Sequence, residues 1–364
     1  MFDVLNNKSI CVLPWVHEHL DLDGTQKPCC YGDTLTENES LDTIRKMMLL
    51  GQQPSACRRC YAQEARKESS HRISETTHWL KKHQEPNVDI VDIQYIDIRN
   101  DPTCNLKCKT CGPFASTLWA KEKGETSNIP NYNLDKYDKK KLKKVYMAGG
   151  EPTYNKKYLK FLNELLIVNP DCEVVINTNL KKLSTEWKQI IPAFKNFTVT
   201  ISCDAIEELG CYVRYPLEWK QFEENVKFCR DYSNHIMFNL VASNLTAHTI
   251  DRTVDWMSQY ANDINISPVW RDNSQNNIWS HTAVPMTHRQ QYINSLTLLK
   301  KYPIASHRAV SFRLTIESLI KNYSEENYNN NTHKLLRQEI QTQDSHRTKQ
   351  LKNIDSFLNS WISL

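Results

Sequence analysis

The chain has 364 residues, 40% apolar and 24% charged, which are the proportions of an ordinary globular protein and exclude a disordered or fibrous one. Its formal net charge of +4 is small for this length and gives no indication of nucleic-acid binding. No stretch approaches the roughly eighteen apolar residues of a membrane span, and the N-terminus lacks a basic-then-apolar signal pattern. We therefore expect a cytoplasmic protein that does not cross a membrane.

Twelve cysteines are an unusual number for a chain expected in the cytoplasm. Thiols stay reduced in that compartment, so this abundance indicates metal or redox chemistry and not a disulfide framework. Glycine is scarce, with only eight residues, yet Gly149 and Gly150 are adjacent. Because glycine is so rare here, the pair predicts a place where two backbone segments approach closely.

The first part of the chain, residues 11–62, is rich in cysteine. Residues 16–30 are expected to form a hairpin of two short strands around the turn Asp23-Gly24. Residues 40–54 are expected to form a helix with Ser40 as its N-cap. The cysteines of this part are Cys11, Cys29, Cys30, Cys57 and Cys60.

From residue 90 onward, short apolar segments alternate with amphipathic ones. Strands separated by helices indicate a parallel sheet with right-handed crossovers. The predicted strands are 91–99, 143–150, 172–179, 197–204, 235–243 and 262–270, and the predicted helices between them are 156–169, 184–194, 216–232 and 247–261. The expected fold class is α/β, a partial (β/α)6 TIM-like barrel with a small N-terminal cysteine-rich module and a helical C-terminal region.

Three parts are therefore expected along the chain. Residues 1–85 form the cysteine-rich module, of which the polar stretch 64–86 is a partly helical linker. Residues 86–275 form the partial barrel, and residues 276–364 form a helical extension.

Cys104, Cys108 and Cys111 fall within eight positions, just after the first predicted strand. Loops at the carboxyl ends of the strands hold the active site in parallel α/β barrels. Three thiolates can hold three corners of a [4Fe–4S] cluster and leave the fourth iron open for a small molecule. A zinc knuckle with a fourth ligand from elsewhere is the alternative.

This C-x3-C-x2-C spacing, followed by Met-Ala-Gly-Gly-Glu-Pro at the end of the second predicted strand, resembles the radical S-adenosylmethionine (radical SAM) superfamily. The resemblance implies that the open iron chelates S-adenosylmethionine, and that Gly149, Gly150 and Glu151 contact its methionine amino group. It implies reductive cleavage to methionine and a 5′-deoxyadenosyl radical, which abstracts a substrate hydrogen atom. Members commonly carry an aromatic residue just before the third cysteine, where this chain has Thr110, so the adenine contact must come from elsewhere.

Further polar residues end the next two predicted strands. Asn177 and Asn179 end the third, and Ser202 and Asp204 end the fourth, where alternation puts these last two on one face and Cys203 on the other. In the family, polar groups at these strand ends meet the ribose or the methionine carboxylate. Ordinary turn residues at strand ends are an equally good interpretation.

The N-terminal cysteines resemble the SPASM/twitch fold, in which four cysteines on a hairpin and a helix bind an auxiliary [4Fe–4S] cluster. The resemblance implies Cys11, Cys29, Cys57 and Cys60 as ligands, although Cys30 competes with Cys29 and the spacing does not decide between them. The cysteines are too few for the two clusters of a full SPASM domain, so one auxiliary cluster is expected. In most relatives the module follows the barrel, whereas here it precedes it; a zinc ribbon is the alternative.

Cys211 lies in the segment predicted to be a loop after the fourth strand, and some radical SAM epimerases donate a hydrogen atom from a cysteine at the active site. The neighbouring Arg214 and Tyr215 could meet an anionic substrate, and a structural ion pair is an equally good interpretation of the arginine. The remaining cysteines are expected to be buried apolar residues. The histidines show no spacing typical of metal ligands; those considered were His17, His19, His71 and His281.

The function these patterns favour is that of a radical SAM oxidoreductase or modifying enzyme acting on a small molecule or peptide. A net oxidation or bond formation, assisted by the auxiliary cluster, is expected, with a flavodoxin or ferredoxin as electron donor. One alternative is a redox-neutral epimerase that uses Cys211 as hydrogen donor. Another is a non-catalytic zinc-stabilised binding protein, which would be colourless and would not bind S-adenosylmethionine.

Overall fold

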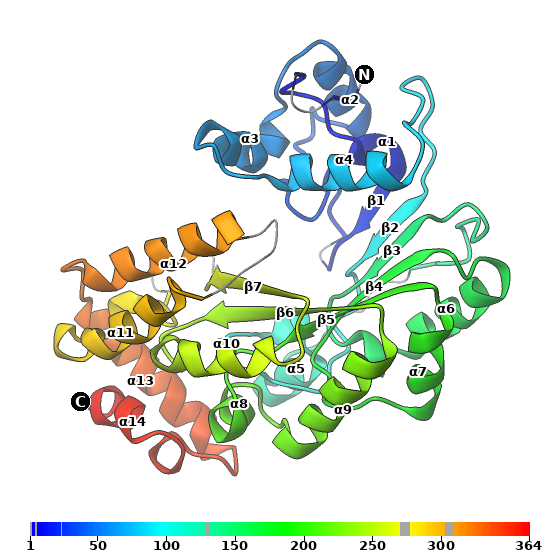
Figure 1. The fold of residues 1–364 in the computed structure, drawn as a ribbon. Helices are drawn as coiled ribbons and strands as arrows, with labels where there is room; N and C mark the ends of the chain where they lie inside the picture. Colours follow the sequence, from blue (N-terminus) through cyan, green and yellow to red (C-terminus); the bar gives the residue numbers. More distant parts are fainter. Residues whose placement is uncertain (1, 4–5, 23, 128–131, 270–276, 303–308) are drawn as a thin grey trace. The chain divides into compact units, whose positions relative to one another are not determined.

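The computed structural model describes residues 2–3, 6–22, 24–127, 132–269, 277–302 and 309–364. Seven strands follow one another in a single sheet in the order β1 to β7 (Figure 1). They are β1 (His17–Leu20), β2 (Tyr95–Ile98), β3 (Lys144–Met147), β4 (Glu173–Thr178), β5 (Asn196–Ser202), β6 (His235–Ala242) and β7 (Asp263–Pro268). The six predicted strands are confirmed as β2 to β7, and β1 is an additional one. Trp270 of the last predicted strand lies outside the described residues.

Contacts within the chain divide it into two compact units. Unit 1 comprises residues 1–104, 113–178 and 184–198, and unit 2 comprises residues 105–112, 179–183 and 199–364. Short 3₁₀ helices occur in both: Ser55–Cys57, Pro113–Ala115, Pro152–Tyr154, Ile191–Ala193, Ala247–Thr249, His281–Ala283, Met286–His288 and Leu351–Asn353.

Unit 1 is built on four parallel strands, with His17 opposite Tyr95, Tyr95 opposite Lys144 and Lys144 opposite Glu173. Its later helices are α5 (Thr117–Lys123), α6 (Lys156–Val168) and α7 (Thr185–Ile190). The side chain of Asn155 caps α6 by accepting hydrogen bonds from two backbone amides of its first turn, which explains why the helix begins there.

Within unit 1, the cysteine-rich module, residues 2–88, contributes most of one hydrophobic core, which Tyr95 of β2 completes. Its helices are α1 (Leu13–Val16), α2 (Leu41–Leu49), α3 (Arg58–Ala65) and α4 (His71–Lys82). Trp15 is fully buried in this core, and its indole Nε1 donates to the carbonyl of Val88 at 2.8 Å. The predicted Ser40 cap of α2 is confirmed, since Ser40 Oγ accepts from the amide of Thr43 at 3.1 Å.

Two predictions for this module are wrong in detail. The expected hairpin does not form among the described residues, because the strand at residues 17–20 pairs in parallel with β2 and the chain at 24–30 is not a strand; Asp23 itself lies outside the described residues. The stretch 64–86 is partly helical, as expected, but its helix α4 buries Trp79 in the core and so packs as part of the module in place of a linker. Glu173 on β4 also fastens this helix, accepting hydrogen bonds from His78 at 3.1 Å and Lys82 at 2.6 Å.

Unit 2 contains the parallel pair β6 and β7, with Met237 opposite Asp263. Every second residue of β6 is buried, as expected for a strand with one face in a core. The helices of this unit are α8 (Glu207–Val213), α9 (Trp219–Tyr232), α10 (Ile250–Ser258), α11 (Arg289–Leu299), α12 (Ala309–Ser324), α13 (Asn330–Ser345) and α14 (Ser356–Ile362). The expected helical C-terminal region is thereby confirmed.

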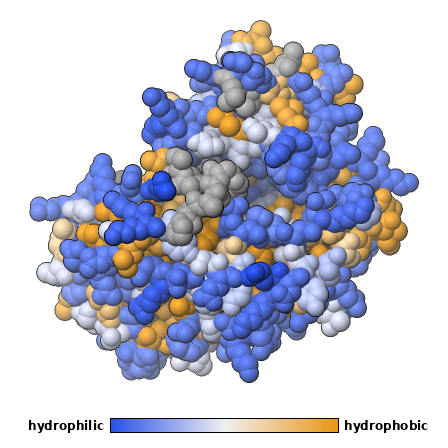
Figure 2. Space-filling model, in the orientation of Figure 1, coloured by the Kyte–Doolittle hydropathy of each residue, from blue (hydrophilic) through white to orange (hydrophobic). Residues whose placement is uncertain are grey.

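Hydrophilic side chains make up most of the face seen in Figure 2. Within the described ranges, none of the helices combines the length and the apolar character that crossing a membrane requires.

Candidate active site and cysteine-lined cavity

The first cysteine of the C-x3-C-x2-C loop comes six positions after the last residue of β2. Cys104 is 9% exposed, and its backbone amide donates to Thr117 Oγ1 at 3.2 Å. The amide of Thr117 in turn donates to the carbonyl of Pro102 at 3.1 Å. The start of α5 therefore holds the backbone of the cysteine loop from the side.

The Gly149-Gly150 pair after β3 approaches the same stretch of backbone. The amide of Gly150 donates to the carbonyl of Asp101 at 2.8 Å, and that of Glu151 donates to the carbonyl of Thr103 at 2.7 Å. A β-carbon on Gly150 would lie 2.3 Å from Thr103 O, and Gly149 has a φ of +99°. Neither position accommodates a side chain without displacing the segment that leads to Cys104. The structure thus shows the close backbone approach that the glycine pair predicts.

Glu151 is 2% exposed and has a fixed orientation. Its Oε1 accepts from the amide of Thr153 at 2.9 Å, from Thr153 Oγ1 at 2.6 Å and from Thr178 Oγ1 at 2.5 Å. The two threonines were not identified from the sequence, although Thr178 lies between the predicted residues Asn177 and Asn179. Three hydrogen bonds to a single oxygen fix the direction in which this carboxylate points.

The other two cysteines of the loop belong to unit 2. The amide of Lys107 donates to the carbonyl of Tyr215 at 2.7 Å, and that of Lys109 donates to the carbonyl of Val213 at 2.7 Å. These two backbone hydrogen bonds, one on each side of Cys108, fix its backbone against the end of α8 and the residues that follow it.

Cys108 is in an electrostatic environment that an arginine dominates. Burial raises the pKa of its thiol to about 12, and the charge of Arg214 opposes this rise. Arg214 is itself held by Asp204, with Nη1 to Oδ2 at 2.8 Å, and the other carboxylate oxygen of Asp204 accepts from the amide of Val241 at 3.0 Å. A cation beside a buried thiol favours the thiolate, the form that binds metal.

Lys109, within the cysteine loop, binds the C-terminal helices of the same unit. Its side chain is fully buried, and Nζ lies 2.7 Å from Asp344 Oδ1 and 4.1 Å from the ring centroid of Tyr212. Tyr212 Oη also donates to this carboxylate, at 3.1 Å. Burial lowers the pKa of Lys109 to about 8, against the opposing effect of Asp344. The sequence gives no signal for this contact.

The remaining predicted residues have varied surroundings. Asn179 Nδ2 donates to Asn105 Oδ1 at 2.9 Å, at the start of the cysteine loop. Asn177 bonds Tyr146, whose phenol pKa burial raises to about 12. Ser202 is partly buried at the end of β5.

The segment around Cys211 is not a loop. Cys211 lies on the helix α8 and is 1% exposed, because the apolar side chains of that helix turn inward. Burial raises its pKa, with Lys349 and Glu208 as the nearest charges. Its role as a hydrogen donor stays a prediction.

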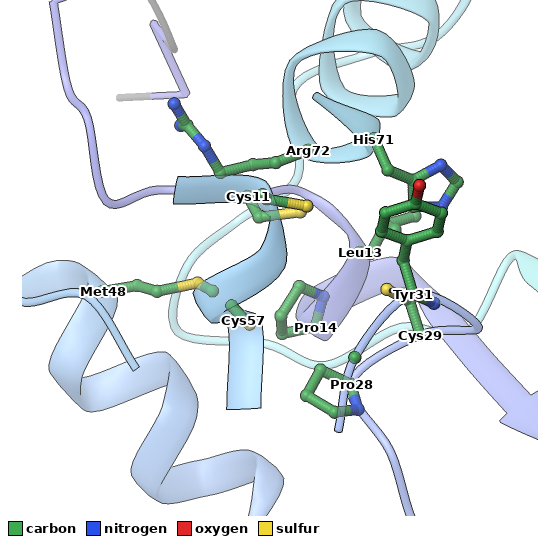
Figure 3. A pocket seen from close by; sticks show the side chains of 12 residues that line it. Cys11, Leu13, Pro14, Pro28, Cys29, Tyr31, Met48, Cys57, His71 and Arg72 are labelled. Carbon is green, nitrogen blue, oxygen red and sulfur yellow. Dashed lines mark hydrogen bonds between the residues drawn. The ribbon is translucent and has the colours of Figure 1, made fainter. Parts of the chain in front are cut away.

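In the N-terminal module, four cysteines from three separate segments line one cavity (Figure 3). They are Cys11, Cys29, Cys57 and Cys60. Burial raises the pKa of each thiol. The neighbouring sulfurs raise the pKa of Cys11 and Cys57 further. Four such thiols form a donor set that suits zinc or an iron–sulfur cluster, either of which would stabilise the thiolates that burial disfavours.

Backbone amides surround the sulfurs of this cavity. Cys29 Sγ accepts from the amide of Tyr31 at 3.4 Å, and the sulfur of Cys11 accepts from the amide of Leu13. The sulfur of Cys60 accepts from the amides of His71 and Arg72, at the N-terminus of α4. Amide hydrogen bonds and a helix N-terminus both stabilise thiolates, and hydrogen bonds of this kind tune iron–sulfur clusters.

The adjacent Cys30 does not line the cavity. Its sulfur lies 3.8 Å from His71 Nε2, and burial raises its pKa to about 12, with Arg99 opposing and Asp97 adding to the rise. Cys29 and Cys30 therefore face different surroundings. His71, whose spacing in the sequence indicates no ligand role, interacts with both cysteines and stacks on Tyr31 with ring centroids 5.5 Å apart.

A buried arginine lies at the edge of the cavity. Arg72 is 2% exposed, forms an ion pair with Glu64 and donates to the carbonyl of Ile10 at 2.6 Å. Its charge also acts on Cys11. The cavity thus combines four sulfurs with a fixed positive charge.

Comparison with known proteins gives one family match. The sequence profile described as "Radical SAM superfamily" matches residues 102–257, which contain the three-cysteine loop and the Gly-Gly-Glu turn. No match to the sequence was found among curated proteins.

Three solved structures match parts of this chain, all at low identity and with TM-scores below 0.5. SuiB of Streptococcus suis bound to the precursor peptide SuiA shares 14% identity, with 74% of this chain and 54% of that chain covered and a TM-score of 0.40. The structure of anSMEcpe with bound AdoMet shares 17% identity, with 57% of this chain and 59% of that chain covered and a TM-score of 0.43. The structure of TYW1 with a lysine-pyruvate adduct shares 11% identity, with 56% of this chain and 72% of that chain covered and a TM-score of 0.35. This chain thus spans little more than half the length of SuiB or anSMEcpe. On the family match, residues 102–257 are a radical SAM domain, which indicates an enzyme and implies a [4Fe–4S] cluster and S-adenosylmethionine as its cofactors.

Proposed function

We propose that the protein is a radical SAM enzyme with one auxiliary [4Fe–4S] cluster, and that it abstracts a hydrogen atom from a small-molecule or peptide substrate for a net oxidation or bond formation. The observation that carries the proposal is the cavity lined by four cysteines in a chain that also has a radical SAM domain. Its ligands would be Cys11, Cys29, Cys57 and Cys60.

At the radical SAM site, Cys104, Cys108 and Cys111 would hold the first cluster. That cluster, when bound, supplies the electron that cleaves S-adenosylmethionine and releases the 5′-deoxyadenosyl radical. Gly149 and Gly150 keep the backbone close to the cysteine loop, and the fixed carboxylate of Glu151 would bind the methionine amino group. Arg214 would offset the negative charge of the thiolate at Cys108.

At the auxiliary site, four cysteines satisfy all four irons of a cluster, so no iron is left open to a substrate. This favours a role in electron transfer over substrate anchoring. An electron acceptor near a substrate radical suits a net oxidation, whereas a redox-neutral epimerisation does not require one. A flavodoxin or ferredoxin would supply the first electron.

The test is to purify the protein anaerobically, reconstitute it, and measure iron, sulfide and S-adenosylmethionine cleavage. About eight irons per chain are expected in the wild type. A Cys104/Cys108/Cys111→Ala variant should retain about four irons and lose cleavage. A Cys57/Cys60→Ala variant should also retain about four, but keep cleavage in the absence of substrate.

Two results would contradict the proposal. Zinc in place of iron in the four-cysteine cavity would leave a metal-stabilised module with no redox role. Cleavage that survives in the Cys104/Cys108/Cys111 variant would place the chemistry elsewhere.

A further inference from the structure

A second group of metal-ligating side chains lies in unit 1, outside both cysteine sites. His17 and His19 stand two residues apart on β1 and therefore share one face of the strand. Asp97 on the adjacent strand β2 is directly opposite His19 in the register (Figure 1 shows the two strands). One potential ligand atom from each of the three lies within 4.8 Å of the others.

All three side chains are buried, with exposures of 3% for His17, 9% for His19 and 0% for Asp97. Among the described residues, Nδ1 of each histidine and Oδ2 of Asp97 make no hydrogen bond of good geometry, although His19 Nδ1 and Asp97 Oδ2 face each other as an ion pair. Leaving a buried polar atom unsatisfied costs about 1–3 kcal/mol, a cost that applies in full to His17 Nδ1 and requires an explanation.

The distance between His19 and Asp97 suits a shared ion as well as the direct ion pair. His19 Nδ1 lies 3.3 Å from Asp97 Oδ2, without the angle of a good hydrogen bond. In a tetrahedral site with bonds of about 2.0–2.1 Å, two ligand atoms are about 3.3 Å apart and both direct their lone pairs at the metal. The spacing matches that arrangement.

The remaining atoms of two of these side chains are held by outer partners. Arg99 Nε donates to Asp97 Oδ1 at 2.7 Å, which leaves Oδ2 as the inward oxygen. His19 Nε2 faces Asp21 Oδ2 at 3.5 Å, and Lys27 binds that same carboxylate. A carboxylate behind the distal ring nitrogen is the usual outer partner of a metal-binding histidine, because it fixes the tautomer that presents Nδ1 to the metal.

We propose that His17, His19 and Asp97 bind one divalent transition-metal ion, with zinc as the best fit. Imidazole nitrogens select zinc, iron, copper or nickel over magnesium and calcium. Two histidines and one carboxylate give zinc three protein ligands and leave one position open to an oxygen or nitrogen donor. The ligands come from two strands, which is why the spacing along the chain did not reveal them. This inference does not depend on the proposed radical chemistry.

The experiment uses the full chain, reconstituted with iron and sulfide, to which one equivalent of Zn²⁺ is added before desalting. Zinc per chain is measured, and the zinc K-edge absorption spectrum identifies its ligands. One zinc is expected, in a shell of nitrogen and oxygen at about 2.0–2.1 Å. Zinc held by cysteine would instead show sulfur at about 2.3 Å.

Variants assign the ligands. His17→Gln and His19→Gln should each weaken zinc binding at least tenfold, with thermal unfolding of the metal-free forms confirming that they fold. Asp21→Asn, which removes only the outer partner of His19, should weaken it by about tenfold. His235→Gln, at a partly buried histidine of β6 that pairs with Asp263, is the matched control and should bind zinc as the wild type does.

Three outcomes would overturn the assignment. They are no stoichiometric zinc, a sulfur-dominated shell, or unchanged zinc binding in folded His17→Gln and His19→Gln. Iron content and S-adenosylmethionine cleavage are measured in the same samples, so that failure of this site is distinguishable from failure of the proposed function.

Discussion

Replacing Gly150 by alanine tests the contact between the glycine pair and the cysteine loop. The new β-carbon would lie 2.3 Å from Thr103 O and 2.6 Å from the carbonyl carbon of Pro102. Both neighbours are backbone atoms, so no side-chain rotation relieves the clash. To reach an ordinary contact of 3.4 Å the two segments must separate by about 1.1 Å.

Moving the two segments apart should lower both the stability of the protein and the rate of S-adenosylmethionine cleavage. It stretches the two backbone hydrogen bonds made by Gly150 and Glu151, each worth about 1 kcal/mol, and adds an overpacking cost of about 1–3 kcal/mol. We expect the free energy of unfolding to fall by about 3 kcal/mol. A displacement of about 1 Å at a reacting centre can lower a rate about 100-fold, and Cys104 is the next residue after Thr103. We therefore expect S-adenosylmethionine cleavage to fall about 100-fold.

The assay is the rate of 5′-deoxyadenosine formation by the reconstituted enzyme, together with its iron content and its thermal unfolding. Gly124→Ala is the matched control, because Gly124 has a φ of +70° but open space around its α-carbon. It should cost about 1–2 kcal/mol of stability through backbone strain and leave cleavage unchanged. The reasoning is refuted if Gly150→Ala cleaves and unfolds like the wild type.

Three further predictions concern Glu173, Lys109 and the pair of neighbouring cysteines, Cys29 and Cys30. Contacts with His78, Lys82 and Lys144 lower the folded-state pKa of Glu173 from 4.5 to about 2, so these contacts stabilise the protein above pH 4.5 and are lost as the pH falls toward 2. Glu173→Gln should therefore lower the free energy of unfolding by up to about 3 kcal/mol at pH 7, and by progressively less below pH 4.5. Denaturation at several pH values measures this difference. Lys109→Met leaves the carboxylate of Asp344 without its buried cation and should lower the free energy of unfolding by about 3 kcal/mol, with an unchanged melting temperature counting against the contact. Cys29→Ser should lose about four irons and Cys30→Ser none, and the reverse pattern would assign Cys30 to the cluster.

The sheet illustrates what the sequence can and cannot predict. The six strands β2 to β7 follow from apolar runs bounded by helices, since each signal lies within a few residues. The partner of His17 is Tyr95, far along the chain, and no local pattern specifies it. The Asp-Gly turn signal favoured a hairpin because local turn chemistry was the only information available there.

The cysteines show the same limit at the level of a site. The spacing of Cys104, Cys108 and Cys111 predicts a cluster site, because the three residues are close together in the sequence. It could not separate Cys29 from Cys30, since these neighbours differ only in what other segments place around them. The partner of Lys109 is 235 residues away, beyond any local pattern.

The core of the cysteine-rich module has a consequence for biosynthesis. Every buried residue of that core, from Phe2 to Tyr95, precedes Cys104 in the chain. Domains fold as units during synthesis, N-terminal parts first. Once about 100 residues have left the exit tunnel, every buried residue of this core is therefore outside the ribosome, whereas Tyr146 and Glu173, which contact the core and α4, follow later. The four cysteines of the cavity leave the tunnel before Cys104, Cys108 and Cys111, so the two groups of cysteines become available to the assembly machinery one after the other.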